Sequence, residues 1–156
     1  MRKVKSSVIR LTQEFSFEMA HALDNYDGPC RNIHGHSYKL SVTVKGQPID
    51  DASDNNNGMV VDFGVIKKVA DEHIVSKYDH ALVLNNASDL SKILKNRAKE
   101  KIIWKDYQPT CENMLLEFMK IIKGNLPENL ILHSVRLKEA PGSYAEWFAE
   151  DNITKD

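Results

Sequence analysis

The chain has 156 residues, of which 42% are hydrophobic and 28% are charged, a composition typical of an ordinary globular domain rather than a disordered or fibrous chain. Lysine and arginine number 21 and aspartate and glutamate 22, so the formal net charge is −1, without the basic excess that draws proteins to nucleic acid. We therefore expect a single domain over residues 1–156, with a small-molecule partner and no nucleic-acid partner.

Targeting and redox signals are weak in this sequence. The apolar runs are far too short to span a bilayer, and the N-terminal residues 1–10 lack the apolar stretch of a signal peptide. The two cysteines, Cys30 and Cys111, can form at most one disulfide, and free thiols are the expected state in a reducing compartment. These features predict a cytoplasmic protein with no membrane partner.

Hydrophobic alternation predicts two antiparallel strands near the start of the chain, over residues 8–19 and 38–44. The link between them, residues 20–37, is rich in turn-forming residues and much longer than a hairpin needs, and loops of that length are usually functional. The polar stretch 46–58 has no periodicity and predicts a surface connection.

Apolar residues at helical spacing predict a first amphipathic helix over about residues 63–78. A second helix is expected to begin with Thr110 as its N-cap and to end at Gly124. Between them, residues 88–99 resemble a short charged helix and residues 101–104 a brief strand.

The end of the chain alternates again over residues 135–139, and a Pro141–Gly142 turn leads to residues 143–148, which predicts a final hairpin. Strands at both ends with helices between them indicate the α+β class. We expect an antiparallel sheet with two main helices on one face.

Three histidines form the strongest chemical pattern. His34 and His36 are two residues apart at the entrance to a strand, so their side chains lie on one face. His21 lies at the end of the preceding strand, and pairing of the strands brings it alongside. Three imidazoles with a vacant fourth position are typical of a catalytic zinc. Two alternatives stay open: the histidines are merely partly buried strand residues, or Cys30 is a fourth ligand of a structural zinc.

Six sequence blocks occur in a characteristic order: FSFEMAH, CRNIHGHSY, GMVVDF, YDHALVLN, PTCEN and VRLKEAPGSYAEW. Together they resemble the 6-pyruvoyl-tetrahydropterin synthase family over most of the chain. The cysteine four residues before HGH and the EAPGSYAEW ending are most similar to its bacterial branch, 6-carboxytetrahydropterin synthase. The resemblance implies the tunnelling fold, in which subunits join their sheets into a barrel and two rings stack as a homohexamer, a dimer of trimers with active sites at subunit interfaces.

The same resemblance implies a zinc-dependent lyase. Its substrate is 7,8-dihydroneopterin triphosphate, and its products are 6-carboxy-5,6,7,8-tetrahydropterin, acetaldehyde and triphosphate, on the route to queuosine and other 7-deazaguanines. One alternative is 6-pyruvoyl-tetrahydropterin synthase, which eliminates triphosphate and keeps the carbon chain. The other alternative is a zinc-stabilised binding protein without catalysis.

Site residues follow from the resemblance by position. His21, His34 and His36 match the zinc ligands that hold the substrate's side-chain hydroxyls. Cys30 matches the catalytic base, and a thiol can act so only where a nearby cation lowers its pKa. Asp79 and His80 match the dyad that completes proton transfer.

Glu139 matches the glutamate that anchors the pterin, since one carboxylate accepts two hydrogen bonds from the 2-amino and N3 positions of the ring. Glu112, with Thr110 and Cys111 at the start of the second helix, matches a further pterin-contacting stretch. The less specific interpretation of Glu139 is a solvent-facing strand residue paired with a lysine or arginine.

Simpler interpretations exist for other positions as well. Cys30 can be an inert loop thiol, and Asp79 and His80 can be ordinary residues after a helix. Two departures from the family pattern limit the resemblance: residues 86–108 form a longer connection than in compact members, and Ala140 follows Glu139 where a threonine is expected.

Overall fold

The computed structural model describes residues 7–97 and 99–153, so the expectations that touch residues 1–6 and Ala98 lie partly outside its described part. Within this described part, six strands form one sheet in the spatial order β4-β3-β1-β2-β5-β6. The strands are β1 (Ile9–His21), β2 (His34–Gly46), β3 (Ala81–Asn85), β4 (Ile102–Lys105), β5 (Ile131–Ala140) and β6 (Ser143–Phe148).

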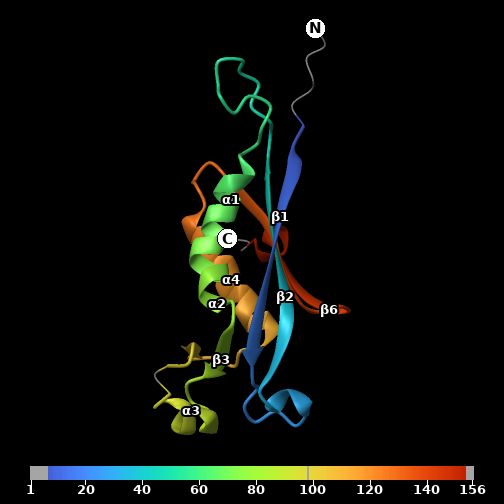
Figure 1. Ribbon diagram of the computed structural model, residues 1–156. Coiled ribbons are helices and arrows are strands. Elements are labelled where there is room, and N and C mark those ends of the chain that lie inside the picture. Colours follow the sequence, from blue (N-terminus) through green and yellow to red (C-terminus); the bar gives the residue numbers. More distant parts are fainter. Residues whose placement is uncertain (1–6, 98, 154–156) are drawn as a thin grey trace.

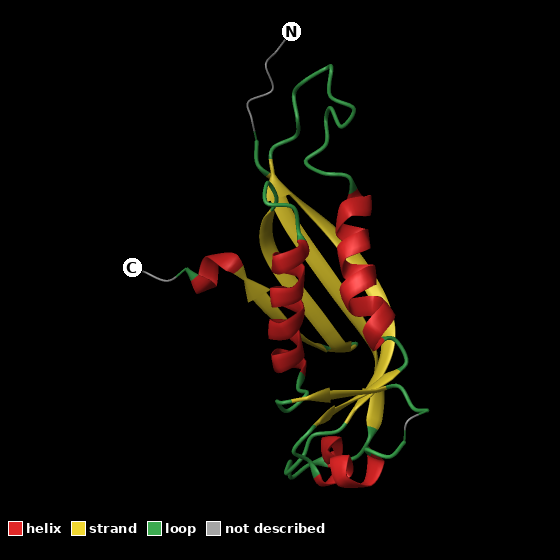
Figure 2. Cartoon of the chain, turned by 90° about the vertical axis from the view of Figure 1, so that its left-hand side faces the viewer, coloured by secondary structure: helices red, strands yellow, loops and turns green. Residues whose placement is uncertain are grey.

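The two main helices lie on the same face of this sheet. Figure 2 shows α1 (Phe63–Ala70) and α4 (Cys111–Asn125) side by side across the long strands, and Figure 1 shows both on one side of β1 and β2. Their buried residues, among them Ile66 and Phe118, pack against Phe17 and Leu40 of the sheet. The α+β prediction with helices on one face is confirmed.

The prediction of a wholly antiparallel sheet is wrong for two strands, because the sheet is mixed. β1, β2, β5 and β6 pair antiparallel, but β3 pairs parallel to β1 and β4 pairs parallel to β3. β3 was not among the predicted strands, and its first four residues, ALVL, form a continuous apolar run. Continuous apolar runs are characteristic of parallel strands covered on both faces, and they lack the alternation that marks antiparallel strands.

The predicted helix over residues 63–78 is present, but its winding changes along its length. α1 continues into a π-helical segment, Asp71–Val75, and then into α2 (Ser76–Tyr78). The charged helix expected over residues 88–99 is shorter, since α3 covers Asp89–Leu94.

The N-cap at Thr110 is confirmed, because its side chain accepts a hydrogen bond from the Asn113 backbone amide. Gly124 does not end α4, which continues to Asn125. Leu126 adopts an extended conformation because it precedes Pro127, and the proline ring disfavours helical geometry in the residue before it.

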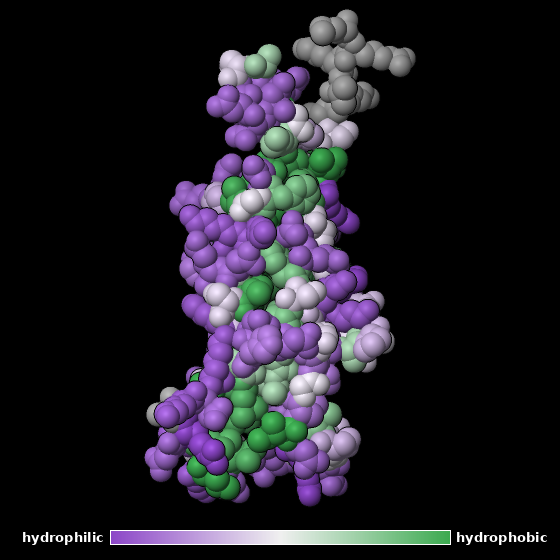
Figure 3. All heavy atoms as spheres, in the orientation of Figure 1, coloured by the Kyte–Doolittle hydropathy of each residue, from purple (hydrophilic) through white to green (hydrophobic). Residues whose placement is uncertain are grey.

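The core lies between the helices and one face of β1 and β2. Phe15, Phe17 and Met19 of β1 alternate inward, as do Leu40 and Val42 of β2. Figure 3 shows polar side chains over most of the visible surface and an apolar patch at the lower end, near α3. Among the described residues, no helix is both long and apolar enough to cross a membrane.

Candidate active site

Three histidines extend the core face of the β1–β2 pair beyond its apolar part. His21 and His34 are directly opposite each other in the antiparallel register, and His36 lies opposite Met19. Alternation along β2 places His34, His36 and the buried Tyr38 on the same face. One side-chain nitrogen from each histidine lies within 4.8 Å of the others. The convergence predicted from the sequence is therefore present.

Backbone carbonyls fix the orientation of two of these rings. Nδ1 of His21 lies 2.8 Å from the Pro109 carbonyl oxygen, and Nδ1 of His34 lies 2.7 Å from that of Asn32. A carbonyl oxygen can only accept, so each Nδ1 carries the proton and donates it. In the neutral rings each Nε2 then presents a lone pair, and these two atoms are 3.1 Å apart. Such carbonyl contacts typically orient metal-bound imidazoles.

The third ring also contributes a nitrogen to the cluster. Nε2 of His36 is buried and has no hydrogen-bond partner in the described structure. Burial lowers the pKa of His21 and favours its neutral, ligating form. A cation at the centre of the cluster would satisfy the facing lone pairs of His21 and His34 and the buried nitrogen of His36. The donor set of three imidazoles fits a divalent metal ion of the zinc type.

Glu139 lies at the edge of this cluster rather than in bulk solvent. The β5–β6 register shifts between Lys138 and Ala140, so Glu139 is the unpaired residue of a bulge. Its Oε1 accepts a 3.1 Å hydrogen bond from the Tyr38 hydroxyl and lies 3.5 Å from Nε2 of His21. The structure therefore does not match the alternative in which a lysine or arginine pairs with Glu139 on the surface.

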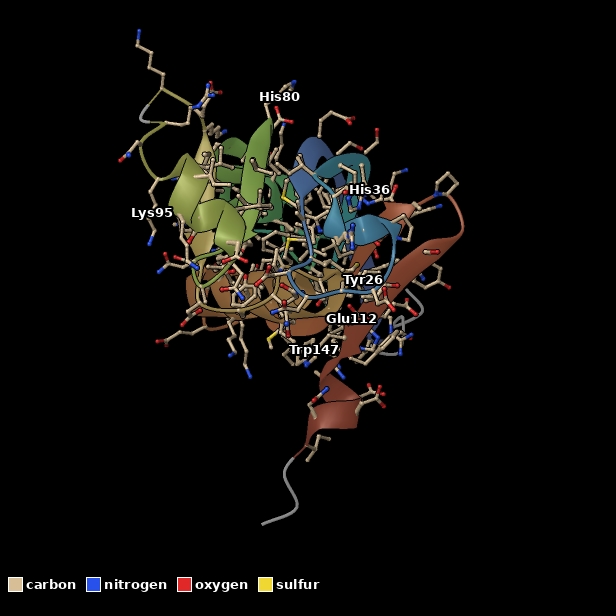
Figure 4. The ribbon with its side chains drawn as sticks, turned by 90° about the horizontal axis from the view of Figure 1, so that it is seen from below. Tyr26, His36, His80, Lys95, Glu112 and Trp147 are labelled. Carbon is tan, nitrogen blue, oxygen red and sulfur yellow. The ribbon has the colours of Figure 1, made fainter. Side chains whose placement is uncertain are left out.

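A cavity of about 300 Å³ opens beside the cluster and collects most of the predicted substrate contacts. Its lining comes from the loop after β1, the start of α4 and the β5–β6 hairpin. The predicted residues in this lining are His21, Cys30, Thr110, Cys111, Glu112 and Glu139. Residues remote in the sequence thus share one space, and Figure 4 shows Tyr26, another lining residue, near Glu112.

The two cysteines in this cavity differ in their surroundings. Cys30 lies in η1 (Pro29–Arg31), and its carbonyl accepts a 2.9 Å hydrogen bond from the Leu23 amide, which closes the loop. The Cys111 thiol donates to the Leu137 carbonyl, and burial and the nearby Glu139 charge raise its pKa to about 12. Cys111 therefore stays protonated. The candidate metal-ligating atoms that lie close together come from His21, His34 and His36 and do not include Cys30. The structural-zinc alternative requires Cys30 among them, so this geometry does not support it.

Asp79 and His80 lie apart from the cavity that holds Cys30. His80 instead lines a larger cavity of about 600 Å³, together with His36 and Lys101. In the view of Figure 4, His80 lies on one side of His36, and Tyr26 and Glu112 lie on the other. Nδ1 of His80 is 2.9 Å from Oδ2 of Asp79, so the two side chains do pair. A hydrogen bond from the Glu18 backbone amide and the contact with His80 lower the pKa of Asp79.

Several supporting residues were missed by sequence reasoning. Tyr38 was assigned to a strand, although its position two residues after His36 on the same face is a signal that could have linked it to the site. Pro109 contributes its backbone carbonyl, which orients His21, and Gln108 contributes its side-chain amide. The Gln108 side chain accepts from the Asp24 amide at 3.0 Å and donates to the Asp24 carbonyl, which fastens the β1–β2 loop to the start of α4. Spacing alone does not reveal such contacts.

The fold and site together define a class: an α+β protein whose three-imidazole centre opens onto a cavity lined by two thiols and carboxylates. A family model described as 6-pyruvoyl tetrahydropterin synthase matches residues 10–150, and the chain belongs to this family. The expected tunnelling-fold relationship is confirmed at the level of the single chain.

Curated relatives sharpen this result. The 6-carboxy-5,6,7,8-tetrahydropterin synthase of Haemophilus influenzae is 31% identical over 143 residues, covering 90% of this chain and 99% of the relative. The protein of the same name from Synechocystis is 32% identical over 138 residues, covering 88% and 91%. These relatives bear out the predicted resemblance to the 6-carboxytetrahydropterin synthase branch and the prediction that the chain is an enzyme.

Solved structures agree on the fold. The 6-pyruvoyl tetrahydropterin synthase of Caenorhabditis elegans aligns with a TM-score of 0.65 at 22% identity, covering 92% of this chain and 96% of that chain. The Plasmodium falciparum protein of that name aligns with a TM-score of 0.66 at 19% identity, covering 90% and 97%.

Proposed function

We propose that the chain is a zinc-dependent lyase that converts 7,8-dihydroneopterin triphosphate to 6-carboxy-5,6,7,8-tetrahydropterin, releasing acetaldehyde and triphosphate. The observation that carries this proposal is the three-histidine cluster opening onto the cavity that holds Cys30 and Glu139, in a chain whose curated relatives bear the name of this enzyme. The reaction takes place in the cytoplasm and supplies queuosine or other 7-deazaguanines.

His21, His34 and His36 would hold the zinc ion. Nitrogen ligands in this number suit zinc and leave a position open for substrate oxygen. When bound, the ion acts as a Lewis acid on the side-chain hydroxyls of the substrate. The Pro109 and Asn32 carbonyls keep the rings in the ligating tautomer, so the protein prepares the centre before substrate arrives.

Glu139 would anchor the pterin ring by accepting hydrogen bonds from its 2-amino and N3 groups. The Tyr38 hydroxyl holds one carboxylate oxygen, which limits the rotation of the side chain. Thr110, Cys111 and Glu112 line the same cavity at the start of α4, where side chains and free helix amides would add further polar contacts. Pterin binding also offsets the cost of keeping Glu139 partly buried.

Cys30 is assigned the role of the base that removes a proton from the substrate, since the protonated Cys111 is unsuited to it. His80 of the Asp79–His80 pair lines a different cavity of the same chain. We assign the pair to the site completed by a neighbouring subunit, in a homohexamer built as a dimer of trimers. The chain would then supply its dyad to one site and its Cys30 to another.

Product analysis tests the function directly. Zinc-loaded protein incubated with 7,8-dihydroneopterin triphosphate should release acetaldehyde in step with triphosphate. In Cys30→Ala, turnover should fall about 10²- to 10⁴-fold while zinc content is retained, since positioned general bases contribute factors of that size. Cys111→Ala is the matched control, because it removes the other thiol of the cavity but keeps the backbone amide at that position, so its loss of turnover should be much smaller.

Two outcomes would redirect the proposal. Triphosphate release with a pyruvoyl product and no acetaldehyde would identify the activity as that of 6-pyruvoyl-tetrahydropterin synthase, the name carried by the family model and by the solved structures. Loss of zinc from Cys30→Ala would instead make Cys30 a ligand, as the non-catalytic zinc-binding alternative requires.

A further inference from the structure

The backbone at Asp79 and His80 is held in an unusual conformation. α2 ends at Tyr78, and His80 has a φ of 59°, in the left-handed region that non-glycine residues rarely occupy. Such a conformation costs on the order of 1–3 kcal/mol and persists where surrounding contacts hold it. β1 supplies two of these contacts, because the His80 amide donates to the Glu18 carbonyl at 2.6 Å and Asp79 Oδ1 accepts from the Glu18 amide at 2.9 Å.

Lys101 also holds this turn. Its Nζ donates to the Asp79 carbonyl at 2.6 Å and to the Ser76 carbonyl at 3.1 Å. Its own carbonyl accepts from the Leu82 amide at 2.9 Å, which fixes it beside the start of β3. The peptide unit between Asp79 and His80 is therefore bonded at both ends: its carbonyl to Lys101 and its amide to Glu18.

The chemistry of lysine suits this position. The last carbonyls of a helix have no partner within the helix and carry partial negative charge, so a cation placed there is favourable. An ammonium group has three donors and no acceptor, and two of the donors here satisfy two carbonyls of one turn. Methionine has a stem of similar length and no donor, so Lys101→Met isolates the contribution of the ammonium group.

We propose that Lys101 is a positioning residue, which sets the orientation of the Asp79–His80 pair by clamping the peptide that joins its two members. The inference rests on the proposed function, which gives that pair its role in proton transfer. It assigns a purpose to the long connection over residues 86–108, since this segment brings Lys101 to the turn. Lys101 lines the same cavity as His80 and His36, and in this role its ammonium group holds the turn through the Ser76 and Asp79 carbonyls.

The test compares the zinc-loaded assembled enzyme with three variants. Lys101→Met should lower kcat about 10- to 100-fold with little change in KM, because small displacements of catalytic groups cost factors of this order. Lys101→Arg should recover most of the loss, since guanidinium also donates to two carbonyls. Lys95→Met is the matched control and should behave as wild type: Lys95 lies in the same connection, and Figure 4 shows it extending from the periphery of the molecule, far from His36. Zinc content and assembly should be unchanged throughout.

A double variant separates this inference from the function on which it rests. If Lys101 acts through the dyad, Lys101→Met should add almost nothing in a His80→Ala background. An equal loss in both backgrounds, or a rise in KM alone, would overturn the inference and indicate direct contact with substrate. An active His80→Ala enzyme would contradict the dyad itself, whereas inactive His80→Ala with fully active Lys101→Met would contradict the role of Lys101 alone.

A folding defect does not end the test. If Lys101→Met fails to assemble, Lys101→Gln takes its place, since a neutral amide can keep one of the two hydrogen bonds. Its kcat should lie between those of wild type and His80→Ala, and wild-type kcat in Lys101→Gln would count against the clamp.

Discussion

The histidine centre and the Asp79–His80 turn are built in contrasting ways. The three histidines lie on β1 and β2, which pair without interruption from Ile9 opposite Gly46 to His21 opposite His34. They follow the buried apolar residues of these strands on the same face of the sheet. The dyad lies on a turn after a short helical segment, and the His80 side chain is 77% exposed. Strand register fixes the first group, whereas hydrogen bonds from Glu18 and Lys101 fix the second.

This difference separates two ways of placing catalytic groups. The burial of apolar side chains along β1 and β2 stabilises the fold, and the same register then aligns the histidines without further devices. The Asp79 and His80 side chains are exposed and polar, and His80 keeps a left-handed φ, so each polar contact there carries a larger share of the stability of the turn. Substitutions of single donors should therefore disturb the dyad more than they disturb the positions of the strands.

The largest expected effect concerns the metal centre itself. His36→Ala leaves two imidazoles, so zinc affinity should fall by about 100-fold or more and turnover should drop to background. The His36 side chain is partly exposed, so the fold should survive. His73→Ala is the control, since His73 lines a separate cavity beside α2. Zinc content and secondary structure measured on both variants test this, and stoichiometric zinc in His36→Ala would contradict the centre.

The sequence predicts the positions of the three histidines well, because these positions depend on local patterns in the chain. Alternation locates β1 and β2, a spacing of two places His34 and His36 on one face, and pairing brings His21 to them. The Thr110 cap is similarly local, since its hydroxyl bonds an amide three residues ahead. These interactions depend on neighbours along the chain or on a single strand pairing.

The structure around Asp79 and His80 is harder to predict from the sequence, because it depends on residues that are remote along the chain. The apolar segment of β3 has no alternation that distinguishes a strand from buried coil or helix, and its parallel pairing requires the crossover through α3. The family resemblance indicates roles for Asp79 and His80, but it does not indicate that Glu18 and Lys101 hold their peptide. The separation of His80 from the cavity of Cys30 likewise appears only in three dimensions.

A matched pair of tyrosines tests these two regions against each other. Tyr38 and Tyr78 are both buried, and each donates a 3.1 Å hydrogen bond to a glutamate, Glu139 and Glu117 respectively. Tyr38→Phe should raise KM about 5- to 10-fold, because the loss of roughly 1 kcal/mol of hydrogen bonding frees the pterin anchor. Tyr78→Phe should reduce stability by a similar free energy and leave KM unchanged. Steady-state kinetics and chemical denaturation of both variants decide, and equal KM values would contradict the role assigned to Tyr38.

The smallest expected effect on turnover comes from the polar cluster that ties α4 to β4, which acts on stability alone. Glu117 accepts hydrogen bonds from Lys105 Nζ at 2.6 Å, from Tyr78 and from Tyr107. Burial alone would raise the pKa of Glu117, but the bonds from Lys105 and Tyr107 outweigh it and lower that pKa. A carboxyl group with a depressed pKa in the folded state stabilises the fold above its unfolded-state pKa, and this contribution is lost as pH falls through the folded-state value.

Glu117→Gln should therefore cost about 1–2 kcal/mol of unfolding free energy at neutral pH, the size expected when hydrogen bonds to a charged group are lost. The difference from wild type should shrink as the solution is acidified from about pH 7 to about pH 3, because wild type then loses the same contribution by protonation. Urea denaturation across this range measures it, with the exposed Glu128→Gln as control. A difference that stays constant with pH would mean that the charge of Glu117 does not help to hold β4 against α4. It would then not help to hold the neighbouring Lys101 either.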